Sequence, residues 1–228
     1  MTSINVGQGF VRLDAAMADD MSVVNAARVS FARQTDAAGE LSAADAGLIN
    51  FLMRERHGTP FEHNAFRFHI KCPIFVAREW FRHRIGSFNE FSARYSEVPN
   101  EFFVPEPDDV RTQVGKPGNY SFEPVDEKLA AETVEMIESM NERAYEMYTH
   151  LVSRGVAKEL ARVVLPVSMM TQFYWTVNAR SLMNFLALRT DNAAQRDIRE
   201  YANAVLEVSR GTMPVTFEAW EKNGRVTP

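Results

Sequence analysis

A dense group of cationic and hydroxyl-bearing residues lies in the segment RHRIGSFNEFSARY, which starts at Arg82. It joins three adjacent cations, Arg82, His83 and Arg84, to a polar segment and a further cation, Arg94. A guanidinium group can donate two parallel hydrogen bonds to the oxygens of one phosphate. Serine hydroxyls and backbone N–H groups can donate to the remaining oxygens. The pattern therefore favours a site for a phosphate-bearing ligand over its alternative, a solvated helix end followed by an ordinary turn.

A second polar group interrupts the apolar C-terminal part of the chain. Arg162 lies in the apolar run ARVVL, and the aromatic and aliphatic stretch that follows contains Asn178, Arg180, Asn184 and Arg189. Arg180 and Asn184 are four residues apart, which places them on one face of a helix. An unpartnered buried polar group costs ~1–3 kcal/mol. We therefore expect these side chains to meet a ligand or acidic partners in a helical interior.

The histidines and the single cysteine do not form the pattern of a metal site. His57, His63 and His69 are six residues apart, whereas a helical zinc site uses two histidines four residues apart. Cys72 is the only cysteine, which excludes a Cys-based zinc site and an intramolecular disulfide. We therefore expect no bound metal, and we expect Cys72 to be a buried, inert packing residue.

The overall composition is that of a globular protein with a sizeable core, since 46% of the 228 residues are hydrophobic. The net charge is −5, from 25 basic and 30 acidic residues, whereas proteins that bind long nucleic acids usually carry a basic surplus. A compact cationic site on an acidic chain indicates a small anionic ligand. The N-terminus does not resemble a secretory signal and no apolar stretch could span a bilayer, so we expect a cytoplasmic protein.

The elements that must position these residues are mostly helical. Ser42 predicts the N-cap of a helix that continues to Arg56, and Asp126 predicts the cap of a long helix that ends at Gly155. Further helices are expected over 21–31, 74–84, 157–165, 168–189 and 192–210. Strict alternation over 66–71 predicts a half-buried strand, while 35–39 and 85–95 are typical of a turn and a loop. The proline-rich region 99–124 is expected to form surface or short strands.

The segment that starts at Arg82 resembles the signature of the flavin-dependent thymidylate synthases, in which Arg-His-Arg is followed after seven residues by a serine, here Ser92. The resemblance extends to AARVSF at 26–31, HGTPFEH at 57–63, the run from Ala161 to Pro166, and the stretch 178–189. The resemblance implies a helix-rich α+β fold with a small, mainly antiparallel sheet. It also implies one domain over 1–228 and assembly as a homotetramer whose active sites are shared between subunits.

The resemblance also implies a function. It implies that the protein converts dUMP to dTMP, with 5,10-methylenetetrahydrofolate as the carbon donor and with FAD reduced by NADPH. It implies that no cysteine acts as the nucleophile, which agrees with the position of Cys72 outside every nucleotide motif. Neither a nucleic-acid polymer nor a membrane is expected as a partner.

The family's site residues can be carried over position by position. The FAD-binding residues would be Ser30, Thr59, Glu62, Arg82, His83, Arg84, Glu90, Asn178, Arg180 and Asn184. The dUMP-binding residues would be Glu79, Arg82, Glu90, Phe91, Ser92, Ala93, Arg94, Arg162 and Arg189. Arg189 would be catalytic because it would favour ionisation of the uracil N3, and His57 would lie near the folate and flavin rings.

Glu79 departs from the family's usual pattern, in which a glutamine lies beside dUMP. A carboxylate cannot donate a hydrogen bond unless it is protonated. We expect Glu79 to pair with Arg82 or His83, which follow it at helical spacings of three and four residues.

Two other classes of function remain as alternatives. A single-stranded nucleic-acid-binding protein would use aromatic rings near the arginines to stack bases; the candidates are Trp80, Phe81, Phe88, Phe91 and Tyr95. A helical scaffold would use the Met/Leu stripe of 126–154 only for assembly, and such a protein would be colourless and would bind no nucleotide.

Overall fold

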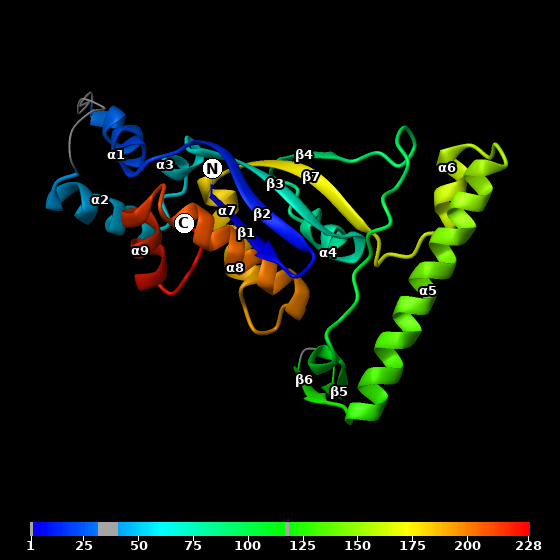
Figure 1. The fold of residues 1–228 in the computed structure, drawn as a ribbon. Coiled ribbons are helices and arrows are strands. Elements are labelled where there is room, and N and C mark those ends of the chain that lie inside the picture. Colours follow the sequence, from blue (N-terminus) through cyan, green and yellow to red (C-terminus); the bar gives the residue numbers. More distant parts are fainter. Residues whose placement is uncertain (1, 32–40, 117–118) are drawn as a thin grey trace. The chain divides into compact units, whose positions relative to one another are not determined.

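The computed structural model describes residues 2–31, 41–116 and 119–228 (Figure 1). The turn predicted at 35–39 lies outside the described residues. The strands are β1 (Thr2–Val6), β2 (Gly9–Met17), β3 (Ala65–Pro73), β4 (Ser87–Glu90), β5 (Arg111–Lys116), β6 (Asn119–Pro124) and β7 (Met170–Asn178). The helices are α1 (Asp20–Arg28), α2 (Ala43–Arg54), α3 (Thr59–Glu62), α4 (Ile74–Trp80), α5 (Glu127–Ser153), α6 (Lys158–Ala161), α7 (Ala179–Arg189), α8 (Arg196–Arg210) and α9 (Pro214–Lys222).

The contacts within the chain divide it into two units. The first unit comprises Met1–Lys71, Glu79–Asn89 and Gln172–Pro228, and the second comprises Cys72–Arg78 and Glu90–Thr171. The prediction of one domain over 1–228 stays a prediction. None of the described helices is both long and apolar enough to cross a membrane.

The main sheet has the strand order β1-β2-β3-β7-β4, and β2 pairs antiparallel with both β1 and β3. In the register of these pairs, Val11 lies opposite Ile4 on one side and Ile70 on the other. Within the first unit, helix α8 packs along β1 and β2 (Figure 1). The predicted α+β class, with many helices and a small antiparallel sheet, is confirmed, as is the strand predicted at 66–71. The hairpin of β1 and β2 was not predicted.

Strand β7 corrects the helix predicted over 168–189. Its side chains alternate between buried and exposed from Phe173 to Val177, with Tyr174 and Thr176 exposed. Aromatic and β-branched residues with a period of two fit a half-buried strand better than a helix. The chain becomes helical only at Ala179, where the Oδ1 of Asn178 accepts a hydrogen bond from the backbone N–H of Ser181 and caps α7.

The core of the first unit is aromatic. Trp80, at the end of α4, stacks on Phe185 of α7 with ring centroids 4.7 Å apart, and it meets Trp175 of β7 edge-on at 5.4 Å. Trp80, Trp175 and Phe185 are fully buried. Such ring pairs stabilise by ~0.5–1.5 kcal/mol beyond their buried area. They fix the end of α4 against β7 and α7.

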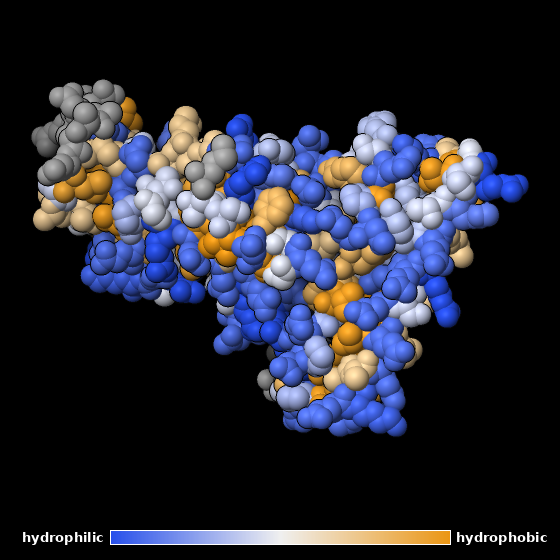
Figure 2. All heavy atoms as spheres, in the orientation of Figure 1, coloured by the Kyte–Doolittle hydropathy of each residue, from blue (hydrophilic) through white to orange (hydrophobic). Residues whose placement is uncertain are grey.

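The second unit contains the long helix α5 and the β5–β6 hairpin. Asp126 caps α5, as predicted, and Gly155 follows its end with a φ of 81°. The strands β5 and β6 are the short strands predicted in the proline-rich region. Where this hairpin lies, hydrophobic side chains appear among hydrophilic ones in Figure 2, and the exposed ones include Val114 and Phe122.

Other helix predictions are confirmed with changed ends. Ser42 caps α2 in a capping box with Asp45, and Gly211 is the C-cap of α8. The helix predicted over 74–84 ends at Trp80, and part of the loop predicted at 85–95 forms β4. The helix predicted over 157–165 is a single α-helical turn, α6, followed by a 3₁₀ turn at Arg162–Val164.

Candidate functional site

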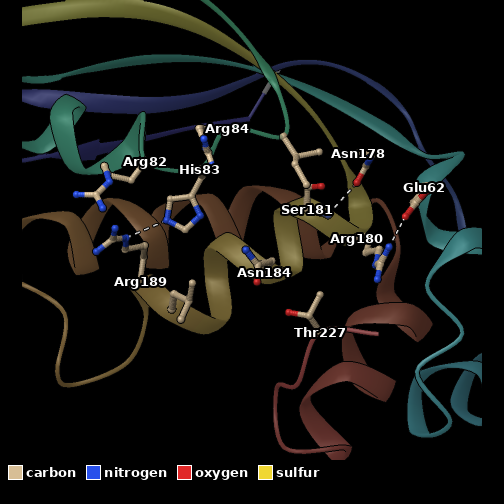
Figure 3. Close-up of a pocket in the computed structure, with 12 residues that line it drawn as sticks. Glu62, Arg82, His83, Arg84, Asn178, Arg180, Ser181, Asn184, Arg189 and Thr227 are labelled. Atoms are coloured by element: carbon tan, nitrogen blue, oxygen red, sulfur yellow. Dashed lines mark hydrogen bonds and ion pairs between the residues drawn. The ribbon is translucent and has the colours of Figure 1, made fainter.

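A cavity of about 730 Å³ lies within the first unit, between the turn after α4 and one face of α7 (Figure 3). Its size is in the range of small-molecule and cofactor sites. It is lined by Glu62, Arg82, His83, Arg84, Ile85, Asn178, Arg180, Ser181, Asn184, Leu188, Arg189 and Thr227. Residues from both polar groups, which are far apart in the sequence, therefore meet at one cavity, although Arg94 and Arg162 do not line it.

Aromatic neighbours hold the Arg-His-Arg turn in place. Phe81, immediately before it, packs edge-on against Phe173 of β7 and against Phe88 of β4, at 5.0 and 4.9 Å between ring centroids. Gly86 follows it, and a Cβ at this position would lie 2.7 Å from the indole nitrogen of Trp175. Only a residue without a side chain allows the backbone to lie this close to β7.

Helix α7 supplies the opposite wall of the cavity. Asn178 caps its N-terminus, and Ser181, Asn184 and Leu188 follow at spacings of three and four residues, as one face of a helix requires. The positive end of the helix dipole and the N–H groups of the first turn favour an anionic ligand at this end. The predicted common face of Arg180 and Asn184 is confirmed, because both line the cavity.

Arg180 is held by contacts from three segments. Its Nη1 donates to Oε1 of Glu62 at 2.5 Å, and its Nε donates to the carbonyl oxygen of Pro228 at 2.8 Å. A Cβ on Gly58 would lie 2.7 Å from the guanidinium carbon of Arg180. Arg180 therefore has an acidic partner from the same chain, which is one of the two arrangements that the sequence predicted. It is exposed, however, and so are Asn184 and Arg162, so the predicted buried interior is wrong for these residues.

Arg189, at the C-terminal end of α7, contacts both Glu79 and His83. Its Nη1 donates to Oε2 of Glu79 at 3.0 Å, and its Nε donates to Nε2 of His83 at 3.0 Å (Figure 3 shows the second contact). The predicted pairing of Glu79 with Arg82 or His83 is therefore wrong. The reason is that α4 ends at Trp80, so residues 82 and 83 do not continue the helical spacing.

Burial shifts the pKa values of His83 and Glu79. Desolvation, reinforced by the cation of Arg189, lowers the pKa of His83 to about 4. Desolvation raises the pKa of Glu79; Arg189 opposes this shift, and the carboxylate of Asp197 adds to it. His83 is therefore a neutral imidazole at pH 7, which corrects its place among the three adjacent cations of the sequence, and its Nε2 lone pair is available to Arg189.

The remaining residues predicted to bind the nucleotide lie in the second unit. Thr171 Oγ1 donates to Oε1 of Glu90 at 2.8 Å, and the guanidinium of Arg94 lies over the ring of Tyr95 at 5.0 Å. Ala93 and Ala161 belong to one buried cluster, against which Phe91 also packs. Two segments therefore pack on the same hydrophobic core. One is the loop with Ser92 and Arg94, and the other is the turn that begins at Arg162.

Four predicted residues of the first unit do not line the cavity, and one of them is Glu79, the partner of Arg189. Ser30, His57 and Thr59 are exposed residues of the first unit outside its lining, and the His57 ring packs edge-on against Phe51 at 5.8 Å. Four lining residues were missed: Ile85, Ser181, Leu188 and Thr227. Ser181 and Leu188 could have been found from their helical spacing with Asn184. No local signal could have placed Thr227.

The structure also bears on the alternatives. Trp80 is fully buried, and Phe81 and Phe88 pack against Phe173. These three of the five candidate rings are not positioned to stack bases, which disfavours a stacking platform built from them; Tyr95 is exposed. Burial and the nearby carboxylate of Glu90 raise the pKa of the Cys72 thiol, so the nucleophilic thiolate is disfavoured.

The cavity is rich in hydrogen-bond donors because four arginines line it with their planar guanidinium groups: Arg82, Arg84, Arg180 and Arg189. Such groups suit phosphate and pyrophosphate oxygens, and the N-terminus of α7 adds backbone N–H donors. Neutral His83 and the amide of Asn184 add donors or acceptors for a heterocyclic ring. The donor set thus fits a phosphate-bearing cofactor with an extended polar ring system, such as a flavin dinucleotide.

Comparisons with known proteins agree with this donor set. A protein-family profile described as thymidylate synthase complementing protein matches residues 12–215. Relatives named flavin-dependent thymidylate synthase from Thermosipho africanus and Thermosipho melanesiensis are 49% and 47% identical over 94% of this chain, and the matches cover 92% and 91% of those proteins. Crystal structures of a UMP/dUMP methylase from Streptomyces cacaoi, bound with 5-Br UMP and 5-Br dUMP, each give a TM-score of 0.88 at 41% and 43% identity. They cover 96% of this chain and 96% and 97% of those chains.

Proposed function

Because the chain belongs to the family of thymidylate synthase complementing proteins, the flavin-dependent thymidylate synthases, we propose that it converts dUMP to dTMP. In this proposal FAD is the cofactor, 5,10-methylenetetrahydrofolate is the carbon donor and NADPH is the reductant. The observation that carries the proposal is the cavity, where the Arg82–Arg84 turn and the polar face of α7 meet. The nucleotide analogues bound by the Streptomyces methylase support dUMP as the substrate.

The residues that would hold FAD are those that line the cavity. Arg82, Arg84 and Arg180 provide cations for its pyrophosphate, and Asn178 and Asn184 provide amides. When bound, FAD supplies the redox chemistry, while the protein supplies binding, orientation and charge. Ser30, Thr59, Glu90 and His57 stay predictions for FAD and folate.

The residues of this chain would act on dUMP by charge and orientation. Arg189 would hold the uracil edge and stabilise the negative charge that develops when N3 loses its proton. Ser92, Arg94 and Arg162 would bind the phosphate and sugar, since hydroxyl and guanidinium groups suit those oxygens. Cys72 would take no part, because burial favours its neutral thiol.

We further propose a homotetramer in the cytoplasm. Helix α5 supports the assembly, because Leu129, Met136, Met140 and Met147 are exposed along it at spacings of seven, four and seven. Residues at these spacings form one apolar stripe of a helix, the kind of surface that a second copy covers. The single cysteine fits a reducing compartment.

The proposed function is tested with purified protein. We expect a flavin absorption spectrum and, on addition of dUMP, methylenetetrahydrofolate and NADPH, formation of dTMP. Arg189→Ala should lower turnover by ~10²–10³-fold while the far-UV circular dichroism spectrum stays unchanged, since one preorganised charge contact is lost. Arg54→Ala, at an exposed arginine of α2 outside the cavity lining, is the matched control. A colourless protein that forms no dTMP would contradict the proposal.

A further inference from the structure

We propose that His83 and Glu79 are positioning residues for Arg189. Together they hold the guanidinium of Arg189 so that its remaining N–H groups face the ligand. The sequence resemblance gave these two residues direct roles at FAD and dUMP; here they act through Arg189. The inference rests on the proposed function, in which Arg189 meets the reacting uracil.

The hydrogen bonds of Arg189 define its orientation. Its Nε donates to Nε2 of His83, its Nη1 to Oε2 of Glu79, and its Nη2 to the backbone oxygen of Glu79 at 3.3 Å. A guanidinium has five N–H groups. In the described part of the chain these three contacts use three of them, and two are left for a planar ligand edge. Arg189 also lines the cavity.

His83 must be neutral to play this part. Arg189 can only donate, so Nε2 of His83 must accept, and the ring proton must lie on Nδ1. The ring is further held by Phe185, which it meets edge-on with centroids 5.0 Å apart. The low pKa of His83 agrees with this geometry, because a protonated ring could not accept the hydrogen bond.

Glu79 holds the other side of the guanidinium with two acceptors, its carboxylate and its own carbonyl. The ion pair is partly shielded from solvent, with 28% of the Glu79 side chain and 21% of the Arg189 side chain exposed. Among the described residues, two further titratable groups act on this pair: His83, on the turn after α4, accepts from Arg189, and the charge of Asp197, on α8, acts on Glu79. A cation fixed in advance needs little reorganisation when negative charge develops beside it.

The first test is a double-mutant cycle measured at matched FAD occupancy. We expect His83→Ala to lower the kcat for dTMP formation by about 10–100-fold, because a misplacement of ~1 Å can cost a hundredfold. His83→Gln should recover most of this loss, since its amide oxygen can replace the acceptor. In an Arg189→Ala background, His83→Ala and Glu79→Ala should have almost no further effect. The control is His63→Ala, at an exposed histidine outside the cavity lining.

The second test does not depend on activity. In the wild-type protein without ligands, ¹⁵N NMR of labelled histidines should show His83 as the Nδ1–H tautomer from pH 7 down to pH 5. Arg189→Ala should shift its ring nitrogens and raise its titration midpoint. An Nε2–H tautomer, spectra unaffected by Arg189→Ala, or additive losses in the cycle would overturn the inference. If the wild-type protein forms no dTMP, the proposed function fails, and the NMR result alone decides whether His83 holds Arg189.

Discussion

Gly58 and Arg180 lie so close that a methyl group on Gly58 would overlap the guanidinium, with its carbon 2.7 Å from Cζ. Gly58 precedes the short helix α3, and Arg180 is the second residue of α7. The absence of a side chain at residue 58 therefore creates the space that Arg180 occupies at the edge of the cavity.

The first prediction follows from this contact. Gly58→Ala should displace Arg180 and weaken FAD binding by about 10–100-fold, since the loss of one charge-assisted contact costs ~1.5–3 kcal/mol. Gly47→Ala is the matched control, because a Cβ on Gly47 within α2 would meet nothing within 4 Å. Replacing that helical glycine should leave FAD affinity unchanged and raise the melting temperature slightly. Titration of the apoproteins with FAD, followed by flavin fluorescence, measures both; equal affinities would refute the role of Gly58.

The second prediction concerns acid stability. The pKa of His83 is about 4 in the folded protein, below its ordinary value near 6.5, so the unfolded state binds a proton first as the pH falls. The stability from this group is therefore complete above pH 6.5 and is lost as the pH falls towards 4. Because solvent screens this partly exposed site, we expect the free energy of unfolding to fall by ~1–2 kcal/mol over this pH range through His83. Thermal melts should show a smaller loss between pH 6.5 and 4.5 in His83→Gln than in the wild type; identical losses would contradict this.

The third prediction concerns the cysteine. Cys72→Ala should keep turnover within a few-fold of the wild type, because the buried thiol has a raised pKa and no proposed step uses it. It should lower the free energy of unfolding by ~1 kcal/mol, since it removes one buried heavy atom. Steady-state assays and urea unfolding measure the two effects. Loss of turnover with normal FAD binding would instead indicate a cysteine nucleophile.

The fourth prediction concerns a buried carboxylate away from the cavity. Asp20, the first residue of α1, accepts hydrogen bonds from the backbone N–H groups of Val215 and Thr216 and from the Thr216 hydroxyl, at 3.0, 2.8 and 2.6 Å. It thereby joins α1 to the N-terminus of α9. Asp20→Asn should destabilise the protein by ~2–3 kcal/mol, because its NH₂ group would face an N–H donor.

The matched control for this prediction is the neighbouring residue Asp19. It caps α1 by accepting from the backbone N–H of Ser22 at 2.7 Å, and asparagine is an equally good N-cap. Asp19→Asn should therefore be nearly neutral. Guanidinium unfolding curves of both variants distinguish a specific role of Asp20 from a general effect of charge; equal stability of the two variants would contradict the prediction.

The sequence by itself determined the features that arise from neighbouring residues. Patterns among residues close in the sequence predicted two helix caps, one helix end and one strand. These are the caps at Ser42 and Asp126, the end of α5 at Gly155 and the strand at 66–71. The common face of Arg180 and Asn184 follows from helical spacing. The family resemblance follows from the Arg-His-Arg motif with Ser92 and from further short motifs in the same order along the chain, and each of these is a local pattern.

Only the tertiary structure decided which distant residues meet. Glu79 pairs with Arg189, 110 residues away, rather than with Arg82, because α4 ends before the helical spacing can bring Arg82 to it. Thr227 lines the cavity because of the path of the chain after α9. Strand β7 pairs with neighbours distant in sequence, and such pairing determines whether an apolar run is a strand or a helix. Local spacing contains no information about these contacts, since they depend on how separate elements pack.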